Sequence, residues 1–289
     1  MITIGGTSQP LILANNCLGD CTFVDRVEAA ASAGFDAIGL SLPAYRAIVA
    51  NQVPPGEMLA MLRANGLRLL ELEAIIGFSA GGTNERGMLA EGLSYTSPDD
   101  LREFWEIAAI FEPRHLQVAG SFHTTVLEQG AAECFAELCD AAAEVGLILS
   151  IEFVPPSNVP NATVALGIVA AADRPNGVIT IDSWSHTRAG GDLDTVRSIP
   201  ASRLGLLQIN DGALEPEVED FIEETVHLRR APGEGEFDLR GLVSAVVATG
   251  ARPPVSVEVM SDELNRLSPR RAAARLADGT RALLADGRG

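Results

Sequence analysis

The chain has 289 residues, of which 47% are hydrophobic and 5% aromatic, enough for one large domain or two small ones. Lys and Arg number 21 against 39 Asp and Glu, and the net charge of −18 disfavours binding to nucleic-acid phosphates or anionic membranes. The sequence shows no membrane-spanning apolar run, no secretion leader and no zinc-type pairing of its four cysteines, so we expect a cytoplasmic protein with free thiols.

Strand-like apolar runs alternate with helical patterns along the whole chain. The predicted strands cover residues 11–14, 35–40, 67–76, 115–119, 147–151, 178–181, 204–209 and 255–259. The predicted helices lie near residues 23–34, 54–66, 97–111, 127–146, 163–172, 192–198, 239–246 and 268–284. Ser97, followed by Pro98, Asp99 and Asp100, is a strong N-cap signal. The Gly-rich segment 77–92 is long for a connection and suggests a lid or substrate loop.

Strict alternation of eight strands with eight helices predicts an α/β fold with a parallel sheet, and eight units predict a closed (β/α)8 TIM barrel. We expect a single domain over residues 1–289. A doubly wound open sheet is the alternative, but no Gly-x-Gly-x-x-Gly fingerprint follows the first strand. In a barrel the carboxyl ends of the strands meet at one mouth, where polar residues are typical of an active site.

Four consecutive strands close on oxygen-bearing side chains, namely Glu152, Asp182, Gln208 and Glu258. Neighbouring strands lie about 4.8 Å apart, so three carboxylates and an amide oxygen can surround one divalent ion. Without a cation, the three acids would raise one another's pKa values. An oxygen-rich shell favours Mn²⁺ or Mg²⁺, with Co²⁺ or Zn²⁺ as alternatives, Zn²⁺ above all where His186 also binds.

Each of these residues has a plainer interpretation when it is considered alone. Asp182 is equally suited to cap a turn, and Glu258 to form a buried salt bridge with an arginine. Gln208 alone is better interpreted as an ordinary hydrogen-bonding group. Their occurrence on four consecutive strands is what favours the metal site.

The motifs around these residues resemble a known family, the xylose isomerase-like TIM barrels of the sugar phosphate isomerase/epimerase superfamily. The segments that carry the resemblance are 151–155, 181–184, 207–211, 230–236 and 257–259. The resemblance implies Glu152, Asp182, Gln208 and Glu258 as metal ligands. Relatives usually have His at position 208, although one branch is similar in carrying Gln. Many also have His at position 185, where this chain has Ser185 with His186 one place later.

The resemblance implies a metal-dependent isomerase or epimerase of a keto sugar or polyol. The reaction would be proton abstraction next to a carbonyl through a metal-bound enediolate, with Glu152 and Glu258 as catalytic residues. The alternative is a metal-dependent lyase or dehydratase of the same superfamily, acting on a keto-inositol, a dehydroshikimate-like acid or a keto-glycoside. Both outcomes share the first step, so the motifs leave them open. The resemblance also implies a homo-oligomer, by analogy alone.

Candidates for binding the small-molecule carbohydrate or polyol substrate are Glu73, His186, Arg188, His227 and Arg230. Arg188 occupies a loop position where relatives often carry an arginine. The segment 211–236 is expected to cover the mouth, with His227, Arg229 or Arg230 in contact with the substrate. Arg230, just before the Pro-Gly-Glu-Gly motif, is preferred to Arg229. The alternative for each of these charges is a solvated loop residue or a surface salt bridge in a very acidic protein.

Two further classes of function remain as alternatives. A barrel endonuclease that cuts abasic DNA is opposed by the net charge of −18 and by the scarcity of histidines, of which there are four. A non-catalytic sugar-binding subunit is suggested by the missing histidines at positions 185 and 208. Two opposed bases, Glu152 and Glu258, argue against it, because a pure binder has no need of them.

Overall fold

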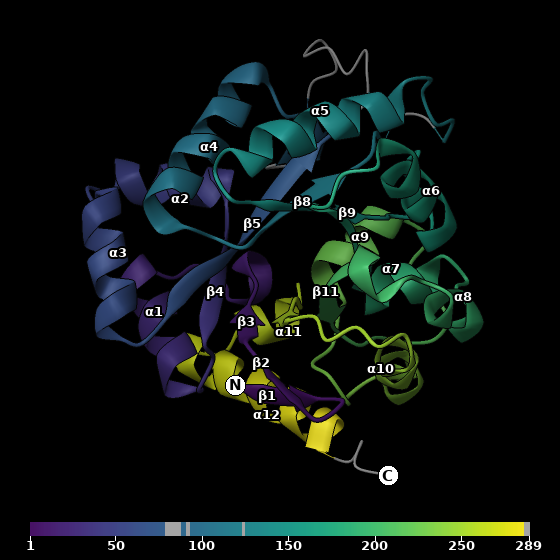
Figure 1. Ribbon diagram of the computed structural model, residues 1–289. Helices are drawn as coiled ribbons and strands as arrows, with labels where there is room; N and C mark the ends of the chain where they lie inside the picture. Colours follow the sequence, from purple (N-terminus) through teal and green to yellow (C-terminus); the bar gives the residue numbers. More distant parts are fainter. Residues whose placement is uncertain (79–87, 91–92, 123–124, 286–289) are drawn as a thin grey trace.

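In the computed structural model, eight parallel strands close into a barrel surrounded by helices (Figure 1). The structure describes residues 1–78, 88–90, 93–122 and 125–285. The barrel strands are, in order around the barrel, β3 (Leu11–Leu13), β4 (Ala37–Ser41), β5 (Arg68–Ile76), β8 (His115–Ala119), β9 (Ile148–Glu152), β10 (Gly177–Asp182), β11 (Leu204–Ile209) and β12 (Val255–Val257). The predicted (β/α)8 barrel is therefore confirmed, and all eight predicted strands belong to it.

The helices at the expected positions lie outside the barrel (Figure 1). They are α1 (Phe23–Ser32), α3 (Pro55–Ala64), α4 (Pro98–Phe111), α5 (Ala131–Ala143), α6 (Ala162–Ala172), α8 (Leu193–Arg197), α10 (Leu239–Ala248) and α12 (Pro269–Ala285). Ser97 caps α4 as predicted: its hydroxyl accepts from the Asp100 amide at 3.1 Å, and the Asp100 carboxylate accepts from the Ser97 amide at 2.7 Å. A cap of this kind stabilises a helix by about 1 kcal/mol.

Several short elements were not expected from the sequence. They are the hairpin β1 (Ile2–Ile4) and β2 (Thr7–Gln9), the pair β6 (Met88–Ala90) and β7 (Leu93–Ser94), the 3₁₀ turns Asn15–Cys17 and Ala201–Arg203, and the helices α2 (Leu42–Ala50), α7 (Ser183–Arg188), α9 (Phe221–His227) and α11 (Asp262–Asn265). Most of the predicted lid falls on residues 79–87 and 91–92, which lie outside the described residues.

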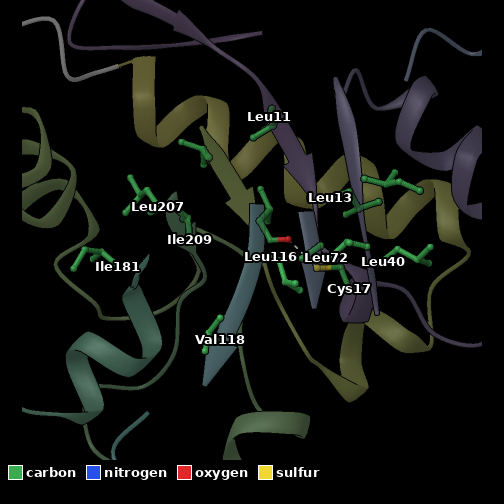
Figure 2. Packing of buried hydrophobic residues seen from close by; sticks show 14 of the residues in the cluster. Leu11, Leu13, Cys17, Leu40, Leu72, Leu116, Val118, Ile181, Leu207 and Ile209 are labelled. Atoms are coloured by element: carbon green, nitrogen blue, oxygen red, sulfur yellow. Dashed lines mark hydrogen bonds between the residues drawn. The ribbon is translucent and has the colours of Figure 1, made fainter. Parts of the chain in front are cut away.

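Side chains alternate between the two faces of the barrel wall. Leu116 and Val118 on β8, and Leu207 on β11, belong to the large apolar core that includes residues of the surrounding helices (Figure 2). Successive side chains of a strand point to opposite faces, so Gln117 and Gln208 point into the barrel. At the level of Gln117 and Gln208, the barrel wall thus has apolar residues on its outside and polar residues on its inside.

The barrel interior also contains a small apolar cluster of its own. It consists of Ile12 on β3, Ala37 on β4, Leu70 on β5 and Leu206 on β11. Because β11 is not a neighbour of β4 or β5, these side chains can meet only across the interior. All four cysteines are free thiols, as expected. No helix in the described part of the chain combines the length and apolarity that crossing a membrane requires.

Candidate metal centre and active-site cavity

Three carboxylates meet at the carboxyl ends of the strands. Glu152 ends β9, Asp182 ends β10, and Glu258 directly follows β12. One oxygen of each lies within 4.8 Å of the others. Gln208 on β11 is in register with Asp182, so the two side chains lie on the same side of the barrel wall, one strand spacing apart. The structure therefore brings the three predicted acids together and places Gln208 beside them.

Asp182 is fixed by two hydrogen bonds. Its Oδ1 accepts from the Ser185 amide at 2.8 Å, which caps α7, and its Oδ2 accepts from Asn210 Nδ2 at 2.7 Å. The capping role that the sequence offered as an alternative is thus present, in the same side chain that belongs to the acid cluster. A carboxylate has about four acceptor positions, so capping leaves lone pairs for a cation.

Arg229 supplies a positive charge to the cluster. Its Nη1 lies 2.9 Å from Glu258 Oε2 and 3.8 Å from Asp182 Oδ2, and its guanidinium is almost completely buried. Its Nε donates to the carbonyl of Thr225 at 3.0 Å. One arginine faces three acids, so the cluster keeps an excess of negative charge. Burial, followed by the charges of Glu258 and Asp182, holds the pKa of Glu152 well above its usual range.

Gln208 contacts a fully buried carboxylate inside the barrel. Its Nε2 donates to Glu71 Oε1 at 3.1 Å, and Gln117 Nε2 donates to the same oxygen at 3.0 Å. Ser256 Oγ donates to the other oxygen of Glu71. Burial raises the pKa of Glu71 to about 7, against these donors. Gln208 Oε1 is buried and has no hydrogen-bond partner among the described residues.

The acid cluster opens into a cavity of about 720 Å³. Glu152, Glu258 and Arg229 form part of its wall, together with polar groups that include Asn15 and Ser41. Aromatic and other apolar groups line the rest, among them Phe104, Phe122, Phe221, Ile222 and Met260. A cavity of this size, mostly apolar with a few convergent polar groups, is typical of a small-molecule site.

Of the predicted substrate residues, Glu73 has access to this cavity and Arg230 does not. Glu73 lines it, and its Oε1 accepts from the Asn15 amide at 3.1 Å. Arg230 instead pairs at the surface with Glu217 at 2.8 Å. The reason is strand alternation: Arg230 forms an antiparallel bridge with Asp211, so its neighbour Arg229 points the opposite way, into the cavity.

The three remaining candidates lie away from the main cavity wall as far as the structure describes it. On α7, Ser185 lines the main cavity, whereas His186 lines a separate one of about 180 Å³. Arg188 forms a buried pair with Glu224 at 2.8 Å and stacks over Trp184, 4.5 Å from the ring centroid. His227 is half-exposed and lies 2.9 Å from Asp262. The His227 contact matches the surface salt bridge given above as its alternative, whereas the Arg188 pair is buried and is neither a solvated loop charge nor a surface salt bridge.

Sequence reasoning weighed Arg229 but preferred Arg230, and it missed the buried network of Glu71, Gln117 and Ser256. A usable signal existed for the network, because a polar residue stands two places before three of the mouth acids. These pairs are Ser150 and Glu152, Thr180 and Asp182, and Ser256 and Glu258. Residues two apart in a strand share a face, so polar residues at this spacing in apolar runs indicate a polar barrel interior.

The described residues fit a divalent cation. The donor set consists of three carboxylates and one amide oxygen, and the acids have a single arginine to balance them. Gln208 Oε1 is a buried acceptor that receives no hydrogen bond from the described residues, which is costly unless a cation or a water molecule satisfies it. Oxygen ligands of this kind suit Mg²⁺ or Mn²⁺.

Comparisons with known proteins agree on one family. The profile of the family described as xylose isomerase-like TIM barrel matches residues 27–283. The chain is 34% identical over 154 residues to a 3-dehydroshikimate dehydratase of Pseudomonas aeruginosa, covering 53% of this chain and 24% of that protein. It is 29% identical over 146 residues to an inosose isomerase of Bacillus velezensis, covering 49% of this chain and 50% of that one.

A solved structure supports the fold across nearly the whole chain. The IOLI protein with a bound zinc atom superposes with a TM-score of 0.82 at 18% identity, covering 96% of this chain and 98% of that one. The chain spans only 18% to 52% of the length of the curated relatives it matches. The relatives found by sequence similarity include a dehydratase and an isomerase, which are enzymes of different reaction classes.

Proposed function

Because this chain belongs to the xylose isomerase-like TIM barrel family, we propose that it is a divalent-metal-dependent isomerase or epimerase of a keto sugar or related polyol. The observation that carries the proposal is the convergence of Glu152, Asp182 and Glu258 at the mouth of a cavity of about 720 Å³. Together with Gln208, these residues would hold the ion, with Mn²⁺ or Mg²⁺ preferred over Co²⁺ or Zn²⁺.

Proton transfer is assigned to the two glutamates. Glu152 and Glu258 stand at the two ends of the arc formed by β9, β10, β11 and β12, and both face the cavity. One removes the proton next to the substrate carbonyl, and the other returns a proton to a neighbouring position or to the opposite face. A divalent ion, when bound, supplies positive charge for the negative charge that develops on the substrate oxygens.

The remaining cavity residues bind and orient the substrate. Arg229 fixes the carboxylate of Glu258 through its bond of 2.9 Å. Asn15, Ser41 and Glu73 offer hydrogen-bonding groups for substrate hydroxyls, while the apolar part of the wall excludes water. We keep Glu73 as a substrate-binding residue and add Arg229 to the set.

A second candidate is a dehydratase, which makes the same first proton abstraction and then expels a hydroxyl as water. It is favoured by the 34% identity to a 3-dehydroshikimate dehydratase, a higher identity than that to the inosose isomerase. In that case the second glutamate protonates the departing hydroxyl. The substrate would be a keto-polyol with a hydroxyl at the β-position, including a dehydroshikimate-like acid.

Mass spectrometry of Mn²⁺-loaded protein with a panel of keto sugars, keto-inositols and 3-dehydroshikimate in deuterium oxide tests both candidates. Isomerisation or epimerisation gives a product of the substrate's composition that carries solvent deuterium. Dehydration gives a product lighter by one water. A panel in which no compound takes up deuterium or loses water, although the protein is loaded with metal, would contradict the proposed proton abstraction.

A further inference from the structure

We propose that Glu71 is a positioning residue that sets which end of the Gln208 amide faces the metal site. The inference rests on the proposed metal site, and it assigns a task to a buried carboxylate that does not reach the cavity. Glu71 is completely buried on β5, on the far side of the interior from β11, so its contact with Gln208 crosses the barrel.

The orientation of Gln208 matters because its two ends have opposite chemistry. The amide oxygen can bind a cation, whereas the NH₂ group is a hydrogen-bond donor and cannot. A glutamine turned the wrong way round would place hydrogens, and a partial positive charge, toward the ion. A histidine in this position would not have that ambiguity between an oxygen and an NH₂ group. A chain that uses glutamine as the ligand therefore needs a neighbouring group that fixes the orientation of the amide.

Glu71 is this neighbouring group, because its two carboxylate oxygens accept hydrogen bonds. Oε1 receives Gln208 Nε2 at 3.1 Å and Gln117 Nε2 at 3.0 Å, and Oε2 receives Ser256 Oγ at 2.5 Å. An acceptor at this place selects the NH₂ end of Gln208, which leaves Oε1 on the other side of the amide. That oxygen is the buried atom without a partner among the described residues.

The orientation of Gln117 is fixed in turn, so Glu71 is not shared with a freely turning group. Thr180 Oγ1 donates to Gln117 Oε1 at 2.7 Å, and Ser150 and Thr180 share a hydrogen bond of 2.6 Å. The network thus runs from β9 through β10, β8 and β5 to β11 and β12. Each donor named in this network has an acceptor, and Gln208 Oε1 is left without a hydrogen-bond partner among the described residues.

The test measures Mn²⁺ binding by titration calorimetry on chelator-treated protein. Glu71→Leu removes the acceptor, so the Gln208 amide loses its fixed orientation, and we expect Mn²⁺ affinity to fall about 10- to 100-fold, the usual range for a lost supporting contact. Glu71→Gln should stay within about threefold of wild type, because its amide oxygen can replace Oε1 while its NH₂ faces the Ser256 hydroxyl. Equal losses in Glu71→Leu and Glu71→Gln would overturn the orientation account in favour of a charge effect.

A double-mutant cycle separates positioning from general damage. In a Gln208→Ala background, Glu71→Leu should cause no further loss of Mn²⁺ affinity, because the amide through which it acts is gone. Thr280→Val, which removes a buried hydroxyl on α12 that takes no part in the network, serves as the control and should keep near-wild-type affinity. A loss from Glu71→Leu that persists without Gln208 would overturn the inference.

A crystal structure of the wild-type protein with Mn²⁺ tests the same point even if Glu71→Leu does not fold. We expect Gln208 Oε1 on the ion and Nε2 on Glu71; a Gln208 side chain out of reach of the ion would overturn the inference alone. Wild-type protein that binds no Mn²⁺ would overturn the proposed function, and the inference with it.

Discussion

The barrel interior contains two buried layers of opposite character. One is the apolar cluster of Ile12, Ala37, Leu70 and Leu206, and the other is the hydrogen-bonded network around Glu71 that lies beside the acid cluster. Both are excluded from solvent. Burial alone therefore does not decide what an interior position does: apolar packing stabilises the fold, and buried polar groups with satisfied bonds support the site.

The largest effect should come from the acid cluster itself. Glu258→Gln keeps the shape and the neighbours of the side chain but removes a proton acceptor, so we expect turnover to fall about 10²–10⁴-fold with the fold retained. Deuterium uptake by the substrate and circular dichroism measure the two effects. Glu28→Gln, a change in an exposed ion pair with Arg270, is the control. Near-wild-type turnover in Glu258→Gln would remove Glu258 as a base.

The two buried arginines, Arg229 and Arg188, should differ in how their loss responds to Mn²⁺. Arg229→Met leaves the acid cluster without its cation, and we expect a loss of about 3–5 kcal/mol in the free energy of unfolding in the presence of chelator. Added Mn²⁺ should recover much of this loss, because the ion supplies the missing positive charge. Arg188→Met, which breaks the buried pair with Glu224, should lose a similar amount that Mn²⁺ does not recover. Equal recovery in both variants would contradict the separation of the two sites.

A substitution in the apolar layer should lower the free energy of unfolding without changing metal affinity. Leu206→Ala creates a cavity in the small interior cluster, and we expect a loss of about 2–5 kcal/mol in the free energy of unfolding. Its Mn²⁺ affinity should stay at the wild-type value, although Gln208 lies only two residues further along β11. Urea titration and calorimetry give the two quantities, and a large loss of Mn²⁺ affinity in Leu206→Ala would show that the layers are not independent.

The smallest predicted effect concerns His115, a buried polar residue at the amino-terminal end of β8. His115 points to the same face of β8 as Gln117, and neither of its ring nitrogens has a hydrogen-bond partner within the part of the chain that the structure describes. Burial lowers the pKa of His115 to about 3. The unfolded chain, with a histidine pKa of about 6.5, therefore binds more protons than the folded one between these two values.

Because of this difference in bound protons, His115 lowers the free energy of unfolding as pH falls below about 6.5. The decrease is about 2 kcal/mol between pH 6.5 and pH 5. In His115→Leu we expect that part of the acid dependence to vanish. Urea unfolding of the wild type and the variant at a series of pH values measures it, and an unchanged slope in His115→Leu would contradict the assignment.

The barrel and its acid cluster were predictable from local patterns. Each strand is a compact apolar run, and Glu152, Asp182 and Glu258 stand where those runs end. The short helices were missed because their periodicity is weak or masked by charge: α9 lies in an acidic segment, and α7 begins directly at Asp182, which was assigned only as a strand end.

The choice between Arg229 and Arg230 could not be made locally. It depends on the bridge between Asp211 and Arg230, which joins residues far apart in the sequence and sets which arginine points inward. The contact between Glu71 and Gln208 is of the same kind, because it crosses the barrel between strands that are not neighbours. Contacts that depend on closure of the barrel have no signature in a short stretch of sequence.

The most direct test of the account is the metal content of the protein. Elemental analysis of protein purified without chelator should find about one Mn²⁺, Mg²⁺, Co²⁺ or Zn²⁺ per chain, and the ion should be absent from a folded Glu152→Ala/Asp182→Ala variant. Wild-type protein that contains no divalent ion and takes none up on reconstitution would contradict the account, and the acids would then form a structural or binding network.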